Sequence, residues 1–188
     1  MKKAFFPILL LAASLLLPGA NDKFSASAGA ALLAPGDAGF KELYGEALLS
    51  PEIKLTYDLM PHFYLWLAAS AVSASCSLPV LEDEIKATQA FLSLGAGWET
   101  RRMGRLQADV AAALLLAGSR EQAMGATNSK WAPGFDVRAG LRYFLGRKFF
   151  AGLTLGYAGA WTTVETGARE KDIILGGLRL GGSLGIRF

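Results

Sequence analysis

Residues 173–188, IILGGLRLGGSLGIRF, change character at every second position. One parity is large and apolar apart from Gly176 and Gly182, and its other members are Ile174, Leu178, Leu180, Leu184, Ile186 and Phe188. From residue 177 onward the other parity holds only glycines, Ser183, Arg179 and Arg187. Because successive side chains of a β-strand point to opposite faces, the segment predicts a strand with one apolar face and one small or cationic face.

A transmembrane helix is the competing interpretation of this segment. Gly177, Gly181 and Gly185 have the four-residue spacing found where membrane helices pack closely. The segment is short for a helix that crosses a bilayer, and Arg179 would lie near the middle of the span. We therefore favour the strand.

The same alternation recurs along most of the chain after residue 20. It is found at residues 24–33, 52–59, 92–99, 106–116, 135–145 and 149–162. Residues 63–75 also suit a strand, but their facing stays open because Phe63, Leu65 and Leu67 compete with Tyr64, Trp66 and Val72. Together with residues 173–188, these segments predict eight strands. Short turns at residues 60–62, 100–104 and 146–148 alternate with longer, polar loops at residues 34–49, 76–86, 118–132 and 164–172.

Composition limits the classes of protein that remain. The chain is 52% hydrophobic and 19% charged, with 22 glycines and a mean hydropathy of +0.32, which excludes a disordered protein. The net charge of +3 falls to a surplus of one when Lys2 and Lys3 are set aside, so no nucleic-acid partner is expected. Cys76 is the only cysteine, which excludes an internal disulfide framework and a multi-cysteine metal site. We expect one domain, with no cofactor and no metal.

Residues 1–20, MKKAFFPILLLAASLLLPGA, have the pattern of a signal peptide. Lys2 and Lys3 precede an apolar core at residues 5–17, which is too short to span a bilayer comfortably. We predict a leader over residues 1–20 and a mature domain over residues 21–188. Cleavage after residue 20 and cleavage after residue 28 both remain open, and an N-terminal anchor helix is the alternative.

The position of the apolar face decides between a soluble and a membrane barrel. In a soluble barrel the apolar parity points inward, whereas in a membrane barrel it faces lipid and the polar parity lines the interior. The apolar parity carries more volume than an eight-stranded interior holds, while the other parity is mainly Gly, Ala, Ser and Thr with a few charges. We therefore predict an all-β, eight-stranded antiparallel up-and-down transmembrane β-barrel, with a secreted soluble barrel that binds lipid as the alternative.

Aromatic residues support the membrane interpretation because they mark both interfaces of membrane barrels. Those at the strand ends beside the short turns are Phe24, Tyr57, Phe63, Trp98, Tyr143, Phe149 and Phe188. Phe135 and Trp161 lie on the side of the long loops. Aromatic residues also end strands in other β proteins, which is the competing explanation.

The alternating pattern over the whole mature chain resembles the small eight-stranded outer-membrane β-barrels of Gram-negative-type bacteria, such as the membrane domain of outer membrane protein A and the opacity-type proteins. The most specific part of the resemblance is residues 180–188, where Leu180, Leu184, Ile186 and Phe188 match the family's C-terminal assembly signal. Gly182 departs from it, since a larger apolar residue is usual there. The resemblance implies recognition by the barrel-assembly machinery, an outer-membrane location, contact with membrane lipid and lipopolysaccharide, and a monomer.

The predicted interior carries five acidic and five basic residues. These are Glu52, Lys54, Asp58, Glu99, Asp109, Asp136, Arg138, Arg142, Arg179 and Arg187. An eight-stranded barrel is just filled by its side chains, and buried charges need partners. We therefore expect salt bridges that plug the lumen. A conducting pore is the alternative, and resemblance to related barrels implies that Lys54 or Arg142 would then act as its gate.

Candidate sites outside the lumen are few. His62, the only histidine, lies in a short turn on the predicted periplasmic side, far from the outer rim where lipid-modifying barrels need a His beside Ser or an acid. Residues 82–84, Glu-Asp-Glu, are a solvated acidic run or a site for a divalent cation or a bridge to lipopolysaccharide. Cys76 is expected at the outer rim as a passive free thiol, with pairing to a second molecule as the alternative.

We expect a non-enzymatic protein with a structural or surface-interaction role carried by four external loops. A small porin or carrier for small or apolar solutes is the rival function, because the loop at residues 34–49 carries apolar side chains that suit the cap of a ligand site. These are Phe40, Leu43, Tyr44 and Leu48.

Overall fold

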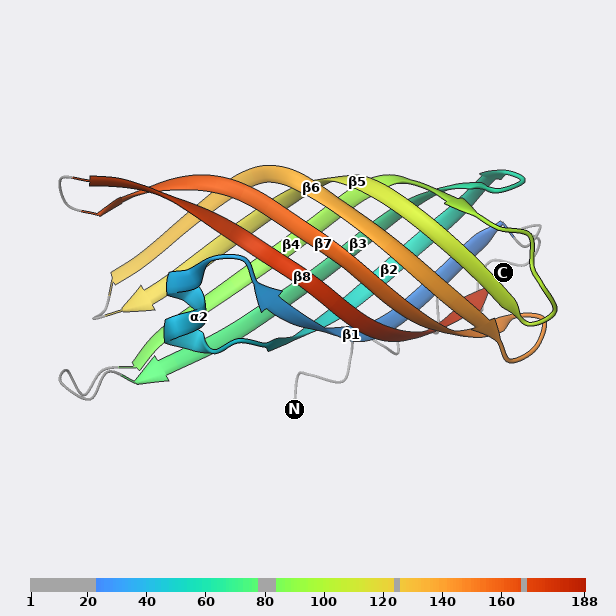
Figure 1. Ribbon diagram of the computed structural model, residues 1–188, viewed down its shortest axis with the longest axis horizontal. Helices are drawn as coiled ribbons and strands as arrows, with labels where there is room; N and C mark the ends of the chain where they lie inside the picture. The colour runs from blue at the N-terminus through green and yellow to red at the C-terminus, as the bar shows by residue number, and fades with distance from the viewer. Residues whose placement is uncertain (1–22, 78–83, 124–125, 167–168) are drawn as a thin grey trace.

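The structure, a computed structural model, is a closed barrel of eight strands paired in chain order (Figure 1). It describes residues 23–77, 84–123, 126–166 and 169–188, so the predicted leader lies outside the described residues. The strands are β1 (Phe24–Pro35), β2 (Leu48–Met60), β3 (Phe63–Ser77), β4 (Glu84–Glu99), β5 (Leu106–Ala123), β6 (Ala126–Phe144), β7 (Phe149–Thr166) and β8 (Arg169–Arg187). Every pair is antiparallel, and β1 pairs with β8 to close the barrel. The predicted fold class is confirmed.

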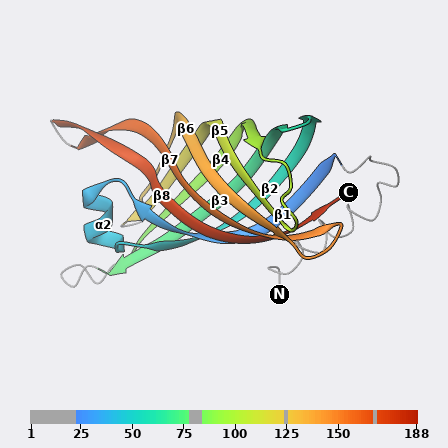
Figure 2. The ribbon, with the colours of Figure 1, turned by 45° about the vertical axis from the view of Figure 1, so that its right-hand side comes forward.

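Two ends of the barrel differ in their connections. The short-turn end carries residues 61–62, 100–105 and 145–148, and it also holds the C-terminus. The opposite end, which we call the loop end, carries helix α2 (Ala38–Tyr44) between β1 and β2. Figures 1 and 2 show α2 and the C-terminus at opposite ends of the barrel. Among the described residues, no helix is long and apolar enough to cross a membrane.

Large apolar side chains cover the outside of the barrel. On β8, Leu178, Leu180 and Leu184 are exposed, and Leu114 on β5 is 80% exposed. Inward positions on the same strands are buried, such as Arg179 on β8 and Asp109 on β5. The barrel is therefore apolar outside, as its alternating sequence predicts.

Strand β3, whose facing the sequence leaves open, turns two aromatic rings inward. Tyr64 and Trp66 are each 1% exposed and Val72 is also buried, whereas Phe63, Leu65 and Leu67 are exposed on the outer face. The register explains the choice, because Tyr64 lies opposite Gly97 of β4 and Trp66 lies opposite Gly95. A Cβ added to Gly97 would overlap the Tyr64 ring. Gly97 of β4 thus makes room for the Tyr64 ring of β3.

The predicted loops at residues 76–86, 118–132 and 164–172 are wrong in extent, because the strands continue into them. β5 and β6 pair as far as Ala123 and Ala126, and β7 and β8 pair as far as Thr166 and Arg169. β3 and β4 likewise pair to Ser77 and Glu84. Beyond a membrane both faces of a hairpin meet water, so its sequence loses the apolar alternation that identifies a strand.

The predicted loop at residues 34–49 contains the seven-residue helix α2. Asp37 caps this helix, since its Oδ1 accepts a hydrogen bond of 2.9 Å from the Phe40 backbone N–H. An Asp side chain at this position satisfies one of the N–H groups that the first turn of a helix leaves unpaired. The cap fixes the start of α2 beside the barrel mouth.

The interior has two layers, of which the sequence predicts only one. Toward the short-turn end the lumen holds the charged residues with Tyr64 and Trp66. Toward the loop end it holds a buried apolar layer, which consists of Leu33, Val72, Phe91, Leu115, Ala117, Ala132, Ala158, Ala160 and Leu175. The expectation of a lumen lined by small and charged residues is therefore wrong for the loop-end half.

Candidate functional site

Arg138 is the centre of the charged layer. Its Nε and Nη2 donate to the two oxygens of Asp136 at 2.9 and 2.7 Å, and its Nη1 donates to Glu52 Oε1 at 2.6 Å. Arg138 and Asp136 are two residues apart on β6, so both point inward. Asp136 also accepts a hydrogen bond of 2.7 Å from the Ser93 hydroxyl. Such bidentate, charge-assisted contacts are among the strongest that side chains make.

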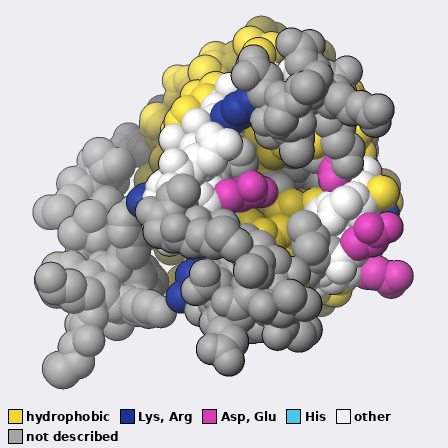
Figure 3. Space-filling view, turned by 90° about the vertical axis from the view of Figure 1, so that its left-hand side faces the viewer, with side chains coloured by type: hydrophobic (Ala, Val, Ile, Leu, Met, Phe, Trp, Pro, Cys, Tyr) yellow, Lys and Arg dark blue, Asp and Glu magenta, His cyan; other side chains and the backbone are white. Residues whose placement is uncertain are grey.

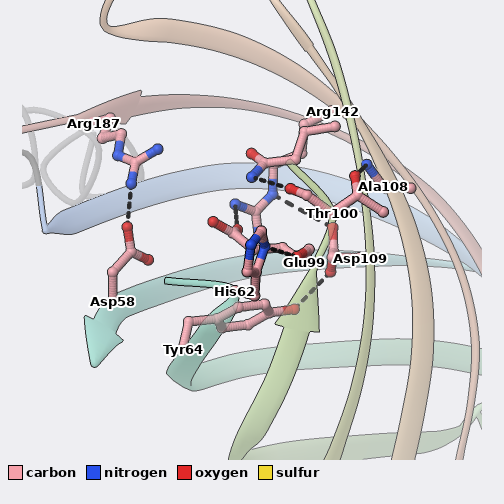
Figure 4. Close-up of polar contacts among 10 residues, drawn as sticks. Asp58, His62, Tyr64, Glu99, Thr100, Ala108, Asp109, Arg142 and Arg187 are labelled. Carbon is pink, nitrogen blue, oxygen red and sulfur yellow. Dashed lines mark hydrogen bonds and ion pairs between the residues drawn. The ribbon is translucent and has the colours of Figure 1, made fainter. Parts of the chain in front are cut away.

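A second cluster surrounds Arg142 nearer the short-turn end (Figure 4). The Nη1 of Arg142 lies 3.2 Å from Glu99 Oε2, and its Nε lies 3.5 Å from Asp109 Oδ1. The hydroxyl of Tyr64 donates to Asp109 Oδ2 at 2.6 Å. Asp109 therefore has both a cation and a hydroxyl donor. At the rim, Arg187 forms an ion pair with Asp58, which Figure 4 shows beside this cluster.

Arg179 and Lys54 are held mainly by aromatic rings. The Arg179 guanidinium carbon lies 4.4 Å from the centre of the Phe91 ring, and its Nη1 is 3.7 Å from Glu52 Oε2. The Lys54 ammonium lies 5.3 Å from the Trp66 ring and 5.5 Å from the Tyr64 ring. The face of an aromatic ring attracts a cation electrostatically. The rings therefore stabilise these two cations in part, as carboxylates stabilise the other cations of the lumen.

All ten predicted interior charges lie on inward faces. Nine of them form the ion pairs given above, and Lys54 lies over the two rings. The space left between them is a cavity of about 50 Å³. Small residues of β1, β7 and β8 line one side of it, namely Ser27, Gly29, Gly152, Gly156, Gly181 and Ser183. This volume admits about one or two water molecules.

Sequence reasoning missed three contributors to this layer: Tyr64, Trp66 and Ser93. The signal that points to Tyr64 is Gly97, which lies opposite it on the inward parity of the neighbouring strand. Ser93 belongs to the same inward parity, and only the closed barrel shows that it meets Asp136 across the lumen.

A second cavity, of about 290 Å³, lies at the loop end beneath α2. Phe40 and Tyr44 of α2 form one side, Leu175 and Ile173 of β8 lie on its apolar side, and its polar lining is Asp37, Thr88, Gln89, Ser119, Glu121, Asn128 and Lys130. Burial raises the pKa of Tyr44, and the nearby Glu121 carboxylate adds to the effect. Figure 3, which views this end, shows acidic and basic side chains around the opening.

Two of the four side chains predicted to cap a ligand site line this loop-end cavity. Phe40 and Tyr44 line it as expected, whereas Leu48 packs against the apolar layer below. The Leu43 side chain and the acidic side chains of residues 82–84 lie outside the described residues. Cys76 is a half-buried thiol at this end. Among the described residues, no group of three His, Cys, Asp or Glu side chains is placed to hold a metal ion.

His62 lies at the short-turn end, in the two-residue turn between β2 and β3. It adopts a φ of 74°, and its Nδ1 is 2.9 Å from the Glu99 carbonyl oxygen. The Trp98 ring centre is 6.2 Å from that of His62. These contacts hold the His62 ring against the end of β4.

The predicted girdle residues lie on the outer face. Those exposed there are Phe24, Phe63, Trp98, Tyr143, Phe149, Trp161 and Phe135. Tyr57 is half-buried, with its ring 4.7 Å from that of Phe24 between centres. In the predicted assembly signal, Leu180 and Leu184 are exposed while Ile186 and Phe188 are half-buried. Recognition by an assembly machinery stays a prediction.

Comparison with known proteins gave matches among solved structures alone. Models of protein families and curated proteins gave no match. OprG, an outer-membrane protein of Pseudomonas aeruginosa, matches with a TM-score of 0.68 at 13% identity, over 88% of this chain and 95% of that one. Neisserial surface protein A matches with a TM-score of 0.64 at 14% identity, over 91% and 100%.

The attachment invasion locus protein Ail of Yersinia pestis, solved with a heparin analogue, is a third similar structure. It has a TM-score of 0.59 at 17% identity, over 88% of this chain and 98% of that one. Identities this low establish the fold alone. The chain therefore has the fold of the small eight-stranded outer-membrane β-barrels of bacteria.

Proposed function

We propose that the protein is an exported, non-enzymatic outer-membrane barrel with a closed lumen, which serves a structural or surface-interaction role through its loop end. The observation that supports this proposal is the pairing of nine of the ten interior charges, which leaves a cavity of about 50 Å³ among them. The short-turn end would face the periplasm, since barrels of this kind keep short turns on that side and long loops outside.

Two closures lie in series along the lumen. The charged layer is held by Arg138, whose Nη1, Nη2 and Nε all donate to carboxylates. Breaking a buried pair of this kind costs about 3–5 kcal/mol, so an open arrangement would be rare. The apolar layer beyond it, around Leu115 and Phe91, offers an ion no replacement for its water.

We expect the purified protein in planar lipid bilayers to give no steady single-channel openings. The Arg138→Gln variant and the Phe91→Ala/Leu115→Ala variant should also stay closed, because each retains one of the two closures. Their combination should conduct. Heat-modifiable gel migration serves as the folding control for each variant. Steady openings from the unchanged protein would overturn the closed lumen and favour the pore.

A carrier for small or apolar solutes is the second candidate, and the loop-end cavity favours it. Its volume of about 290 Å³ and its Phe40, Tyr44 and Leu175 lining suit a small ligand with an apolar part. Below this cavity the buried side chains of Phe91 and Leu115 fill the lumen. We therefore favour a site that binds at the surface over a path through the barrel.

Liposome swelling separates these two functions. We expect proteoliposomes with the unchanged protein to swell in small sugars and amino acids no faster than protein-free liposomes, because the lumen is closed below the cavity. Liposomes that contain a large general porin provide the positive control. Solute-dependent swelling above the protein-free rate would replace the surface role with the carrier.

A further inference from the structure

Five exposed cations lie on two turns at the short-turn end. Arg101, Arg102 and Arg105 lie on the turn between β4 and β5, Arg147 and Lys148 lie on the turn between β6 and β7, and all five are exposed. We call these five residues the basic turn cluster. Among the residues that the structure describes, no exposed Asp or Glu lies at this end.

The acidic residues nearest this end point into the lumen. Asp58 pairs with Arg187 and Glu99 pairs with Arg142. Their negative charges are therefore neutralised inside the barrel, and they do not offset the cations of the rim. Among the described residues, the exposed charged side chains of this end are therefore all basic, whereas the charges of the lumen balance.

Backbone and side-chain contacts hold the two turns side by side. Arg102 Nε donates to the Gly104 carbonyl at 2.9 Å within its own turn, and Arg102 Nη2 donates to the Gly146 carbonyl of the other turn at 3.2 Å. The same guanidinium lies 4.1 Å from the Phe144 ring centre. Figures 1 and 2 show the two turns next to each other at the end of the barrel. The five cations therefore occupy one sector of the rim.

This sector borders the aromatic residues of the outer face. Arg105 Nη1 reaches back to the Tyr143 hydroxyl at 3.3 Å, and Trp98 and Phe149 are exposed on the strands that enter the same two turns. Aromatic belts lie at the level of lipid headgroups, so cations beside them lie among the headgroups. A soluble acidic partner would not need a cation turned toward the lipid-facing side.

The loop end lacks this one-sided charge. Among its described and exposed residues, the cations Lys41, Lys86 and Arg120 are matched by the acids Glu42, Glu46 and Glu121. Figure 3 shows both signs on that face. The basic turn cluster is therefore a local feature of one end and does not follow from the net charge of the chain.

We propose that the basic turn cluster binds the phosphate headgroups of anionic phospholipids in the membrane leaflet at the short-turn end. Arginine suits this ligand because its planar guanidinium donates two parallel hydrogen bonds to a phosphate. Several cations near an anionic surface add their attractions. The inference rests on the proposed membrane location and names the lipid class that this end of the barrel takes.

Electron paramagnetic resonance with spin-labelled lipids tests the proposal. The unchanged protein is reconstituted in phosphatidylcholine bilayers, and the association of spin-labelled phosphatidylglycerol is compared with that of spin-labelled phosphatidylcholine. We expect a preference of about threefold for phosphatidylglycerol. This preference is smaller than the one that roughly 1 kcal/mol per cation would give, because that attraction applies at a strongly anionic surface. The label reaches both leaflets, so the orientation of the protein in the bilayer does not matter.

Two matched triple variants identify the end that is responsible. R101Q/R147Q/K148Q removes three of the five cations and should lower the preference by at least half, whereas K41Q/K86Q/R120Q, which removes the same charge at the loop end, should leave it unchanged. Heat-modifiable gel migration confirms that both variants are folded.

Several outcomes would overturn the proposal. They are an unchanged protein without the preference, a preference that R101Q/R147Q/K148Q leaves undiminished, and an equal loss in both triple variants, which would indicate net charge alone. Binding of polyglutamate to the detergent-solubilised protein, without any preference for phosphatidylglycerol, would assign the cluster to a soluble acidic partner. A protein that fails to enter bilayers at all would contradict the membrane location and not this inference.

Discussion

Replacement of Arg138 by Met is expected to destabilise the folded barrel by about 3–5 kcal/mol, because removing one partner of a buried ion pair leaves the other charge uncompensated. Arg138 is 5% exposed, and the two carboxylates that it neutralises are Asp136, which is 0% exposed, and Glu52. Arg179, with its Nη1 at 3.7 Å from Glu52, is too far away to replace these hydrogen bonds. The measurement is the free energy of unfolding from urea titrations of the protein folded into lipid vesicles.

Two comparisons make the result specific. Arg142→Met should cost less than Arg138→Met, since the ion-pair distances of Arg142 are 3.2 and 3.5 Å and Asp109 keeps the hydroxyl of Tyr64. The double variant D136N/R138M, which keeps Glu52 as the ion-pair partner of Arg179, should recover much of the loss, because a neutral amide is cheaper to bury than an unpaired carboxylate. A loss for Arg138→Met no larger than that for Arg142→Met would contradict the central position of Arg138.

The sequence predicts the barrel well because lipid acts on every outward side chain in the same way. The alternation of residues 178–188 is enough to define the facing of β8, where Leu178, Leu180 and Leu184 point outward. That periodicity is local, so it needs no knowledge of neighbouring strands. The same reasoning cannot orient β3, where apolar residues occupy both faces and the inward Tyr64 ring depends on Gly97 of the next strand.

The candidate site is less predictable than the fold. Sequence patterning identifies which charges point inward, but not which of them meet. Glu52 and Arg138 are 86 positions apart, on β2 and β6, and face each other only across the closed lumen. The apolar layer is hidden for a related reason, since Leu33, Phe91 and Leu115 each interrupt a different strand and form one cluster only in three dimensions.

The outward face of β7 provides the second large effect, and it tests the membrane location directly. Leu155 is 51% exposed and lies midway along β7 between Phe149 and Trp161, whose aromatic side chains mark the two interfaces. In a bilayer, Leu155→Arg should destabilise the barrel by about 2–4 kcal/mol, whereas an arginine at the interface costs about 0–1 kcal/mol.

Leu145→Arg is the matched control, because Leu145 is 58% exposed just beyond Tyr143 at the short-turn end. Urea titrations in lipid vesicles measure both variants. In a soluble barrel both substitutions would be nearly neutral, because an exposed leucine then faces water. A near-zero effect of Leu155→Arg on the free energy of unfolding would therefore reject the membrane barrel, while the strand topology would still hold.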